Sequence, residues 1–294
     1  MDETLSITAI EFEKTSVLSH GISIKDFNNS YDAGKALVSQ FEKKDLSYIL
    51  VLSDGSLVNG SELVRGMNEV AGEDVLITGG MAGDGSNFSS TLVGLNDNPA
   101  EGLIAGIGLY GKNLCVRHGS QGGWETFGLE KLVTRSDQNE LFEIENYSAL
   151  ELYKQYLGPE AESLPGSALL FPLALTLPDS GEPVVRTILS INHQKGSMTF
   201  AGDIPVGSKV RFMKANFDRL TEAASVAAIE SMKKQTSQPA FAMLISCVGR
   251  KLILGSRTVE EVQAVNNSFG SHTVIAGFYS YGEISPFNDG KDCQ

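Results

Sequence analysis

The chain has 294 residues, of which 41% are hydrophobic and 20% charged, and 23 basic against 36 acidic residues give it a net charge of −13. This length and composition allow a sizeable core and suit two domains or two halves of one, while the acidic balance and the lack of a Lys/Arg cluster exclude nucleic acid and anionic membranes as expected partners. The cysteines, Cys115, Cys247 and Cys293, are too few and too far apart for a disulfide framework or a CxxC metal or redox site. The start, MDETLSITAI, lacks the basic region and long apolar core of a signal peptide, and no run of about 18 apolar residues occurs, so we expect a soluble, cytoplasmic protein.

Strands and one helix are predicted over the first part of the chain. The segment LSITAIEFE (5–13) alternates as a half-buried strand does, and SVLSHGISI (16–24) reads as its antiparallel partner. Apolar residues at helical spacing then predict a helix over residues 32–44.

The stretch from Tyr48 to Gly85 organises the rest of the chain. A short apolar run (49–52) ends in Ser53-Asp54-Gly55, a helical pattern follows, and a second apolar run (75–77) breaks into glycines. This pattern is typical of a strand–helix–strand unit. Ligands of α/β proteins usually lie beyond the carboxyl ends of parallel strands, so we expect these Gly-rich ends to border a site.

Beyond Gly85 the pattern changes to short apolar runs, a Gly-rich loop, a hairpin and a helix. The apolar runs predict a small antiparallel meander, the loop carries the only tryptophan, Trp124, and the helix begins at Ser148 as N-cap and ends at Gly158. The runs are 91–96, 102–111 and 113–118; the loop is 119–128, and the hairpin is 131–145, turning at 137–139.

The second half repeats these ingredients. Strands are predicted over residues 167–177, 183–192, 197–202, 241–250 and 273–283, and helices over 214–235 and 259–269. Segments 241–250, 259–269 and 273–283 echo the organising stretch: ILVLSDG matches AMLISCVG in pattern, SELVRGMNEVAG matches TVEEVQAVNNSFG, and VLITGGMAGDG matches TVIAGFYSYGE, so that Gly79 falls on Gly277. We therefore expect an α/β fold of mixed sheets with flanking helices, in which two related halves each contain a βαβ unit and dock around a shared cleft.

A family resemblance extends over nearly the whole chain. VLSDGSLVNGSELVRGM, ITGGMAGDGSNFSST, GSQGGWETFG and TRSDQNELFEIENYSALELYKQYLG resemble the FIST N domain, and LLFPL, VVRTILSIN, SMTFAGDIP, ISCVGRKLILGSR and GFYSYGEISP resemble its partner, FIST C. The resemblance implies a FIST N-like domain over 1–160 and a FIST C-like domain over 161–294. It also implies that both are shortened, because a strand–helix segment ending in a GCSTAGE-like loop is missing before residue 1, and an LHNQT-like strand is missing after Cys293 and Gln294.

This resemblance implies a bacterial intracellular input module. Such modules lie beside, or are fused to, histidine kinases, chemoreceptors and cyclic-nucleotide enzymes, and they are thought to sense small ligands, with amino acids proposed. Some members bind haem and respond to nitric oxide.

Acidic residues and glycines at the first strand ends are candidate ligand contacts. Asp54 offers a carboxylate to an amine or to backbone amides, and equally fits an Asx turn. Gly79, Gly80 and the neighbouring Asp84 allow close backbone approach to a ligand, and equally serve tight turns. The spacing matches neither a Walker nor a dinucleotide fingerprint.

The strongest candidates lie in FYSYGE (278–283). Phe278, Tyr279, Tyr281 and Glu283 offer an apolar wall, hydroxyl groups and one negative charge, which suits an amino acid or amine; the alternative is an aromatic core strand. In the same region, Arg250 could pair with a ligand carboxylate or with a protein carboxylate.

Trp124, Cys247 and the histidines each allow a further interpretation. Trp124 could cover the cleft or fill the meander. Cys247, at a strand end near Arg250, suggests a cysteine-dependent enzyme as an alternative. The histidines show no paired metal spacing, and any of them could serve as an axial haem ligand, with His118 slightly favoured because it ends a strand beside the GSQGGW loop.

From these features we expect a non-catalytic sensory module without a metal site. It would bind a small polar molecule, such as an amino acid or a related metabolite, between its two sets of strand ends, and would pass the signal to a partner protein. A haem-based nitric oxide sensor and a cysteine-dependent enzyme are the alternatives.

Overall fold

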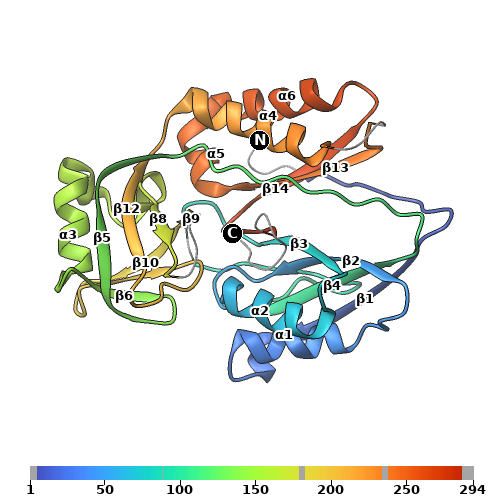
Figure 1. Cartoon of the computed structure of the whole chain (residues 1–294), viewed down its shortest axis with the longest axis horizontal. Helices are drawn as coiled ribbons and strands as arrows, with labels where there is room; N and C mark the ends of the chain where they lie inside the picture. The colour runs from blue at the N-terminus through green and yellow to red at the C-terminus, as the bar shows by residue number, and fades with distance from the viewer. Residues whose placement is uncertain (1–4, 88, 179–182, 234–237, 287–294) are drawn as a thin grey trace.

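The computed structural model describes residues 5–87, 89–178, 183–233 and 238–286, and Figure 1 shows its three parts. A five-stranded sheet with α1 and α2 lies at the lower right, an antiparallel sheet with α3 on the left, and a two-stranded parallel sheet below α4 and α6 at the top. The expected α/β class, with mixed sheets and flanking helices, is confirmed. Cys293 lies outside the described residues.

The five-stranded sheet has the order β1-β4-β2-β3-β15. Strands β2 and β3 are parallel, whereas β4 is antiparallel to both of its neighbours and β15 is antiparallel to β3. Its elements are β1 (Ser16–Ser23), α1 (Ser30–Ser39), β2 (Leu46–Ser53), α2 (Gly60–Ala71), β3 (Leu76–Met81), β4 (Leu103–Tyr110) and β15 (Gly282–Ile284).

Helices α1 and α2 pack on one face of this sheet and on each other. Leu37 of α1 and Leu63 and Met67 of α2 are fully buried in its core with Ile49. The two helices approach so closely that a Cβ on Gly66 of α2 would lie 2.0 Å from the Tyr31 carbonyl oxygen of α1. Strands β1 and β2 run in the same direction, since both are antiparallel to β4, so α1 and α2, which follow them, have their N-terminal ends at the same edge of the sheet.

The antiparallel sheet has the order β10-β11-β6-β5-β12-β8-β9, with β7 paired to β6. Its elements are β5 (Glu125–Asp137), β6 (Glu140–Ile144), β7 (Tyr147–Ser148), α3 (Ala149–Leu157), the 3-10 helices η2 (Gly158–Ser163) and η3 (Gly166–Leu170), β8 (Leu173–Thr176), β9 (Pro183–Arg186), β10 (Ile188–Asn192), β11 (Ser197–Phe200) and β12 (Lys209–Lys214). Leu141, Tyr153, Phe200 and Phe212 fill its core, which α3 covers. Strands from both sides of residue 160 therefore share one sheet and one core.

The two-stranded sheet is the second βαβ unit. Its elements are α4 (Phe217–Ser231), β13 (Phe241–Cys247), α5 (Val248–Leu254), η4 (Gly255–Arg257), α6 (Thr258–Phe269) and β14 (Val274–Ser280). Val51 pairs with Gly79 in the first unit, and Leu244 pairs with Gly277 in the second, as the aligned patterns require. A Cβ at Gly79 would lie 1.8 Å from the Val51 carbonyl oxygen, and one at Gly277 would lie 2.0 Å from that of Leu244. Both glycines are therefore needed by the parallel pairing itself.

Several predicted elements differ from the observed ones. Residues 5–13 form no strand, and Leu5 and Ile7 are 85% and 83% exposed, so β1 pairs with β4 instead. The meander over 91–118 is wrong in its outer runs, because only β4 is a strand there and Val93 and Ala100 form an isolated bridge. The strand predicted through Arg250 ends at Cys247, where α5 begins.

Other local predictions are confirmed. The hairpin turns between β5 and β6, Ser148 accepts the Glu151 backbone N–H as the N-cap of α3, and Gly158 ends that helix at a φ of 59°. In the described ranges, no helix combines the length and the apolarity needed to cross a membrane.

Candidate functional site

A cleft of about 380 Å³ lies between the helical ends of the first α/β unit and the antiparallel sheet. The segment before α1, the β2–α2 loop and the start of α2 form one wall. The β5–β6 turn, β10 and β11 form the other, and Tyr281 also lines the cleft. The side chains lining the cleft include Asn29, Asn59, Glu62, Gln138, Thr199 and Tyr281.

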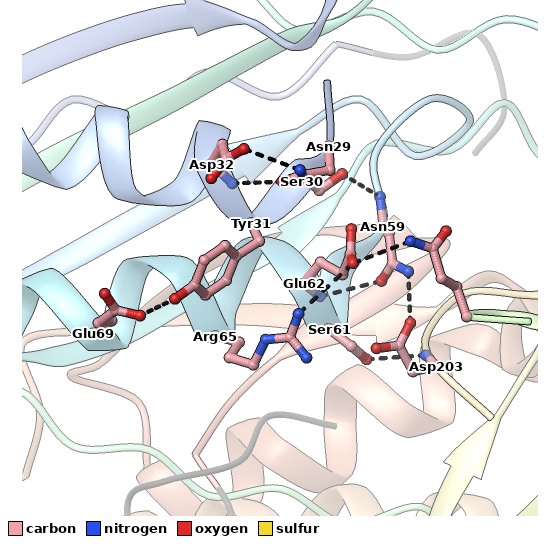
Figure 2. Close-up of polar contacts among 11 residues, drawn as sticks. Asn29, Ser30, Tyr31, Asp32, Asn59, Ser61, Glu62, Arg65, Glu69 and Asp203 are labelled. Atoms are coloured by element: carbon pink, nitrogen blue, oxygen red, sulfur yellow. Dashed lines mark hydrogen bonds and ion pairs between the residues drawn. The ribbon is translucent and has the colours of Figure 1, made fainter. Parts of the chain in front are cut away.

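Two helix N-termini open on this cleft. Asn29 caps α1 by accepting the Asp32 backbone N–H at 2.8 Å, and Asn59 caps α2 by accepting that of Glu62 at 3.2 Å. The two caps are joined, because the Asn59 backbone N–H donates to Ser30 Oγ at 2.9 Å (Figure 2). Asparagine is a favoured N-cap residue, so these sites follow from the local sequence. The caps place the positive ends of both helix dipoles at one wall.

Hydrogen bonds cross from this wall to the opposite one. Asn59 Nδ2 donates to Asp203 Oδ1 at 2.7 Å, and the Asp203 backbone N–H donates to Ser61 Oγ at 3.3 Å. Gln138 Nε2, from the β5–β6 turn, donates to Glu62 Oε1 at 3.4 Å. Figure 2 shows Asn59 between Ser30 and Asp203. Hydrogen-bonded polar groups from both walls therefore border the cleft.

Glu62 is the only charged side chain that lines the cleft among the described residues. The residue is 8% exposed, and Arg65 approaches its carboxylate at 3.7 Å. The rest of the polar lining consists of amides and hydroxyl groups, and Leu57, Val58 and Leu189 supply apolar surface. This lining can hydrogen-bond a small polar molecule and favours one that carries a positive group.

Tyr281 is the one sequence-predicted ligand residue that lines the cleft. Its hydroxyl group donates to Asp84 Oδ1 and to the Gly85 carbonyl oxygen. Burial acts to raise the pKa of Asp84, but hydrogen bonds from Tyr281, Ser89 and Ser90 outweigh it and lower that pKa to about 2. Asp84 therefore holds the GGMAGDG loop against Tyr281 and does not line the cleft.

Asp54 lies at the end of β2, buried below the cleft. Of the two roles that the sequence allowed, the geometry supports the turn, because the Asp54 carboxylate accepts hydrogen bonds from inside the protein. Its donors are the backbone N–H groups of Ser56 (2.7 Å), Leu57 (2.9 Å) and Gly102 (2.8 Å), and Thr91 Oγ1 (2.8 Å).

The space expected between Gly79 and Gly277 is filled by side chains. A Cβ on Gly80 would lie 2.7 Å from Ile245, 3.1 Å from Ser280 Oγ and 3.2 Å from Phe278, so the two βαβ units are in direct contact here. The expectation of a ligand cleft at this place is wrong, because the small residues of β3 allow the β13–β14 sheet to pack directly on it. Phe278 belongs to this packing.

Arg250 is committed to protein groups. Arg250 Nη2 and Nε lie 2.7 and 2.8 Å from Glu261 Oε2, and Nη2 donates to the Leu220 carbonyl oxygen at 2.6 Å. Nη1 donates to the carbonyl oxygens of Gln121 and Gly122 at 3.0 and 3.2 Å. Of the roles that the sequence allowed, the geometry supports the structural pair. Trp124 lies partly buried after the loop that Arg250 anchors, and it does not line the cleft.

Glu283 and Tyr279 lie near the Arg250–Glu261 pair. Glu283 Oε1 is fully buried without a hydrogen-bond partner in the described structure, and burial raises the pKa of this carboxyl group to about 7. Burial, together with the charge of Glu261, also raises the pKa of Tyr279 to about 12. Neither residue lines the cleft.

The cysteine and histidine candidates also lie outside the cleft. Burial, and secondarily the charge of Glu283, raises the pKa of Cys247 to about 12, which disfavours the thiolate that a nucleophile needs. His118 Nδ1 lies 3.2 Å from Ser285 Oγ, and burial lowers the pKa of the ring. Among the described residues, no histidine lines the cleft or the smaller cavity of about 180 Å³ beside Cys115, so neither cavity offers the histidine ligand on which the haem alternative was based.

Sequence reasoning missed Gln138, Thr199 and Asp203 as part of a site. Asn59, which precedes Ser61 and Glu62, reads first as a helix start in the sequence, and it is the N-cap of α2. The available signal was the pair of Asn-capped helix starts at Asn29 and Asn59, since two caps on neighbouring helices of one α/β unit face the same edge of the sheet.

Two family models match the chain. The FIST N domain matches residues 1–146, and the FIST C domain matches residues 149–286. No curated protein matches.

Proposed function

The chain belongs to the FIST family, whose FIST N and FIST C domains are sensory domains of signal transduction, and on this basis we propose that it binds a small polar ligand in the cleft between α1, α2 and the antiparallel sheet. We propose an amino acid or a related metabolite as the ligand. The module is proposed to be cytoplasmic and non-catalytic, and to signal to a bacterial partner such as a histidine kinase, a chemoreceptor or a cyclic-nucleotide enzyme.

The observation that carries this proposal is the cleft itself. Its volume of about 380 Å³ is within the range of small-molecule sites, and its polar lining is gathered at two helix N-termini. A ligand carboxylate is favoured near those positive ends, and a ligand ammonium is favoured near Glu62. One zwitterion can satisfy both.

We propose that signalling arises because the two walls together include residues of both the FIST N and the FIST C regions. Asn59 and Glu62 come from the FIST N region, whereas Thr199 and the neighbouring Asp203 come from the FIST C region. A ligand that contacts both walls favours the arrangement in which both are correctly placed, and this difference in affinity shifts the population toward that arrangement.

Binding is favoured over catalysis because the described lining of the cleft places no histidine or lysine beside its serine, threonine and tyrosine hydroxyl groups to activate them as nucleophiles. The lining contains no cysteine, lysine or histidine, and Cys247, on which the enzyme alternative depends, is held as a thiol elsewhere. The haem alternative gains no support from the two cavities, because no histidine is among their described lining residues.

The proposal is tested by a thermal-shift screen of amino acids and related metabolites, followed by calorimetry. A ligand at 100 times its Kd stabilises the folded protein by about 2.7 kcal/mol, which is a readily measured shift. Thr199→Val and Glu62→Gln should weaken binding, whereas Glu222→Gln, an exposed change on α4, should leave it unchanged. Equal effects of cleft and control variants, or no stabilising compound in the screen, would count against the proposal.

A further inference from the structure

Glu283 is the central residue of β15 and lies where the two α/β units meet. We call this contact the seam and define it by Gly80, Met81, Ile245, Phe278 and Ser280. Within it, the Met81 backbone N–H donates to Ser280 Oγ at 3.2 Å, and the Tyr281 backbone N–H donates to the Met81 carbonyl oxygen at 3.1 Å. Glu283 pairs directly with Gly80 of β3. Paired residues of antiparallel strands point to the same face, so Glu283 lies on the face that β13 and β14 cover.

Within the described residues, Glu283 Oε1 has no hydrogen-bond partner to neutralise it. The charge of Arg250 of α5 acts on it, but the donors of this guanidinium are committed to Glu261 and to the carbonyl oxygens of Leu220, Gln121 and Gly122. Glu261 of α6 also accepts a hydrogen bond from Ser246 Oγ, at 2.7 Å. The other titratable groups nearby are the Cys247 thiol of β13 and the Tyr279 hydroxyl group of β14.

A charge count shows the consequence. Ionised Glu283 would add a second negative charge to the pair of Arg250 (+1) and Glu261 (−1), which leaves a net charge of −1 in a buried region. A buried charge without a partner is costly, and a protonated carboxyl group costs much less to bury. Protonation is therefore the state that suits the closed seam.

We propose that Glu283 is a proton-binding site of the seam, and that loss of this proton weakens the contact between β3–β15 and β13–β14. The inference goes beyond ligand binding in the cleft and does not depend on it. Tyr281 connects the cleft and the seam, because its side chain lines the cleft and its backbone N–H donates to the Met81 carbonyl oxygen of the seam. A proton on Glu283 and a ligand in the cleft would then influence each other reciprocally.

The sign of the pH dependence follows from the change in pKa on folding. The pKa rises from 4.5 to about 7 in the folded protein. Below 4.5 the group is protonated in both states and has no effect on stability. Between 4.5 and about 7 the folded protein keeps the proton that the unfolded chain releases, so stability falls as the pH rises through this interval and then levels off.

The test is a titration of the carboxyl groups in protein labelled with ¹³C-glutamate, together with melting temperatures over the same pH range. In the wild type, one glutamate resonance should titrate near pH 7 and should be absent from Glu283→Gln. The variant, which keeps the shape of the protonated side chain, should lose that part of the pH dependence of melting, and the exposed control Glu222→Gln should retain it.

Hydrogen exchange tests the structural consequence. After correction for the intrinsic pH effect, the backbone amides of Met81 and Tyr281 should exchange faster in the wild type above pH 7, but not in Glu283→Gln. A wild type in which every glutamate titrates near 4.5 would overturn the proposal, and this readout requires no variant to fold. A variant with the wild-type melting profile or the wild-type exchange profile would also overturn it.

Discussion

Asn59 Nδ2 donates to Asp203 Oδ1 at 2.7 Å, which joins two residues 144 positions apart in the chain. Asn59 starts α2, and Asp203 follows β11 in the antiparallel sheet. The same asparagine accepts the Glu62 backbone N–H and donates its own backbone N–H to Ser30. One side chain thus sets a helix start and holds it against the opposite wall of the cleft.

The two roles of Asn59 can be separated by substitution. Asn59→Ser keeps a side chain that can cap α2 but loses the amide that reaches Asp203, so we expect a loss of about 0.5–1.5 kcal/mol of stability, as for one net hydrogen bond. Urea unfolding of this variant, of Asp203→Ala and of the double variant measures the loss and the coupling between the two sites.

Asn29→Ser is the matched control for this bond. Asn29 caps α1 in the same way, but its Nδ2 donates only locally, to Asp32 Oδ2 at 3.0 Å. We expect it to cost less than Asn59→Ser. An additive double variant, with no coupling between positions 59 and 203, would show that the bond contributes nothing in solution.

The equivalent glycines of the two βαβ units should respond alike. Gly79→Ala and Gly277→Ala each place a Cβ within 2.0 Å of a carbonyl oxygen on the paired strand. The strands must separate to admit it, so we expect each variant to lose about 1–3 kcal/mol or more. Thermal unfolding measures the loss. Gly166→Ala is the control, since no atom lies within 4 Å of its Cβ position, and it should be close to neutral.

The thiols should differ in reactivity. Cys115 is exposed, whereas the pKa of Cys247 is raised by burial to about 12, so in a Cys293→Ser background only Cys115 should react quickly with a thiol reagent at neutral pH. Cys247 should react only as the protein unfolds. Time-resolved labelling and mass spectrometry check this, and rapid labelling of Cys247 in the native protein would restore the case for a reactive cysteine.

Local sequence signals predicted the elements but not the cleft. Ser148, Gly158 and the turn at 137–139 act within a few residues of themselves, and each lies where the pattern indicated. The segment 5–13 has a strand pattern, but its expected partner β1 pairs instead with the distant strand β4 and lies at the edge of the sheet. Near and distant segments thus compete to pair with β1. Periodicity contains no information on this competition.

The site depends on contacts that are distant in sequence. Gln138, Thr199 and Asp203 reach the ends of α1 and α2 only because the antiparallel sheet packs beside the first α/β unit. The aromatic stretch 278–283 was correctly placed at a strand end, but the packing of Phe278 against Gly80 depends on how two units dock, which neither unit specifies alone. Of that stretch, only Tyr281 reaches the cleft.

The pairing of β5 with β12 and of β6 with β11 has a consequence for how the molecule can be divided. The β5–β6 hairpin belongs to the FIST N region, yet it lies between strands of the FIST C region in a single sheet. Separate expression of the two regions would expose both sides of this hairpin and would leave β11 and β12 without their neighbours. The two regions should therefore unfold in one cooperative transition, and they should regain structure only when both are present in the same solution.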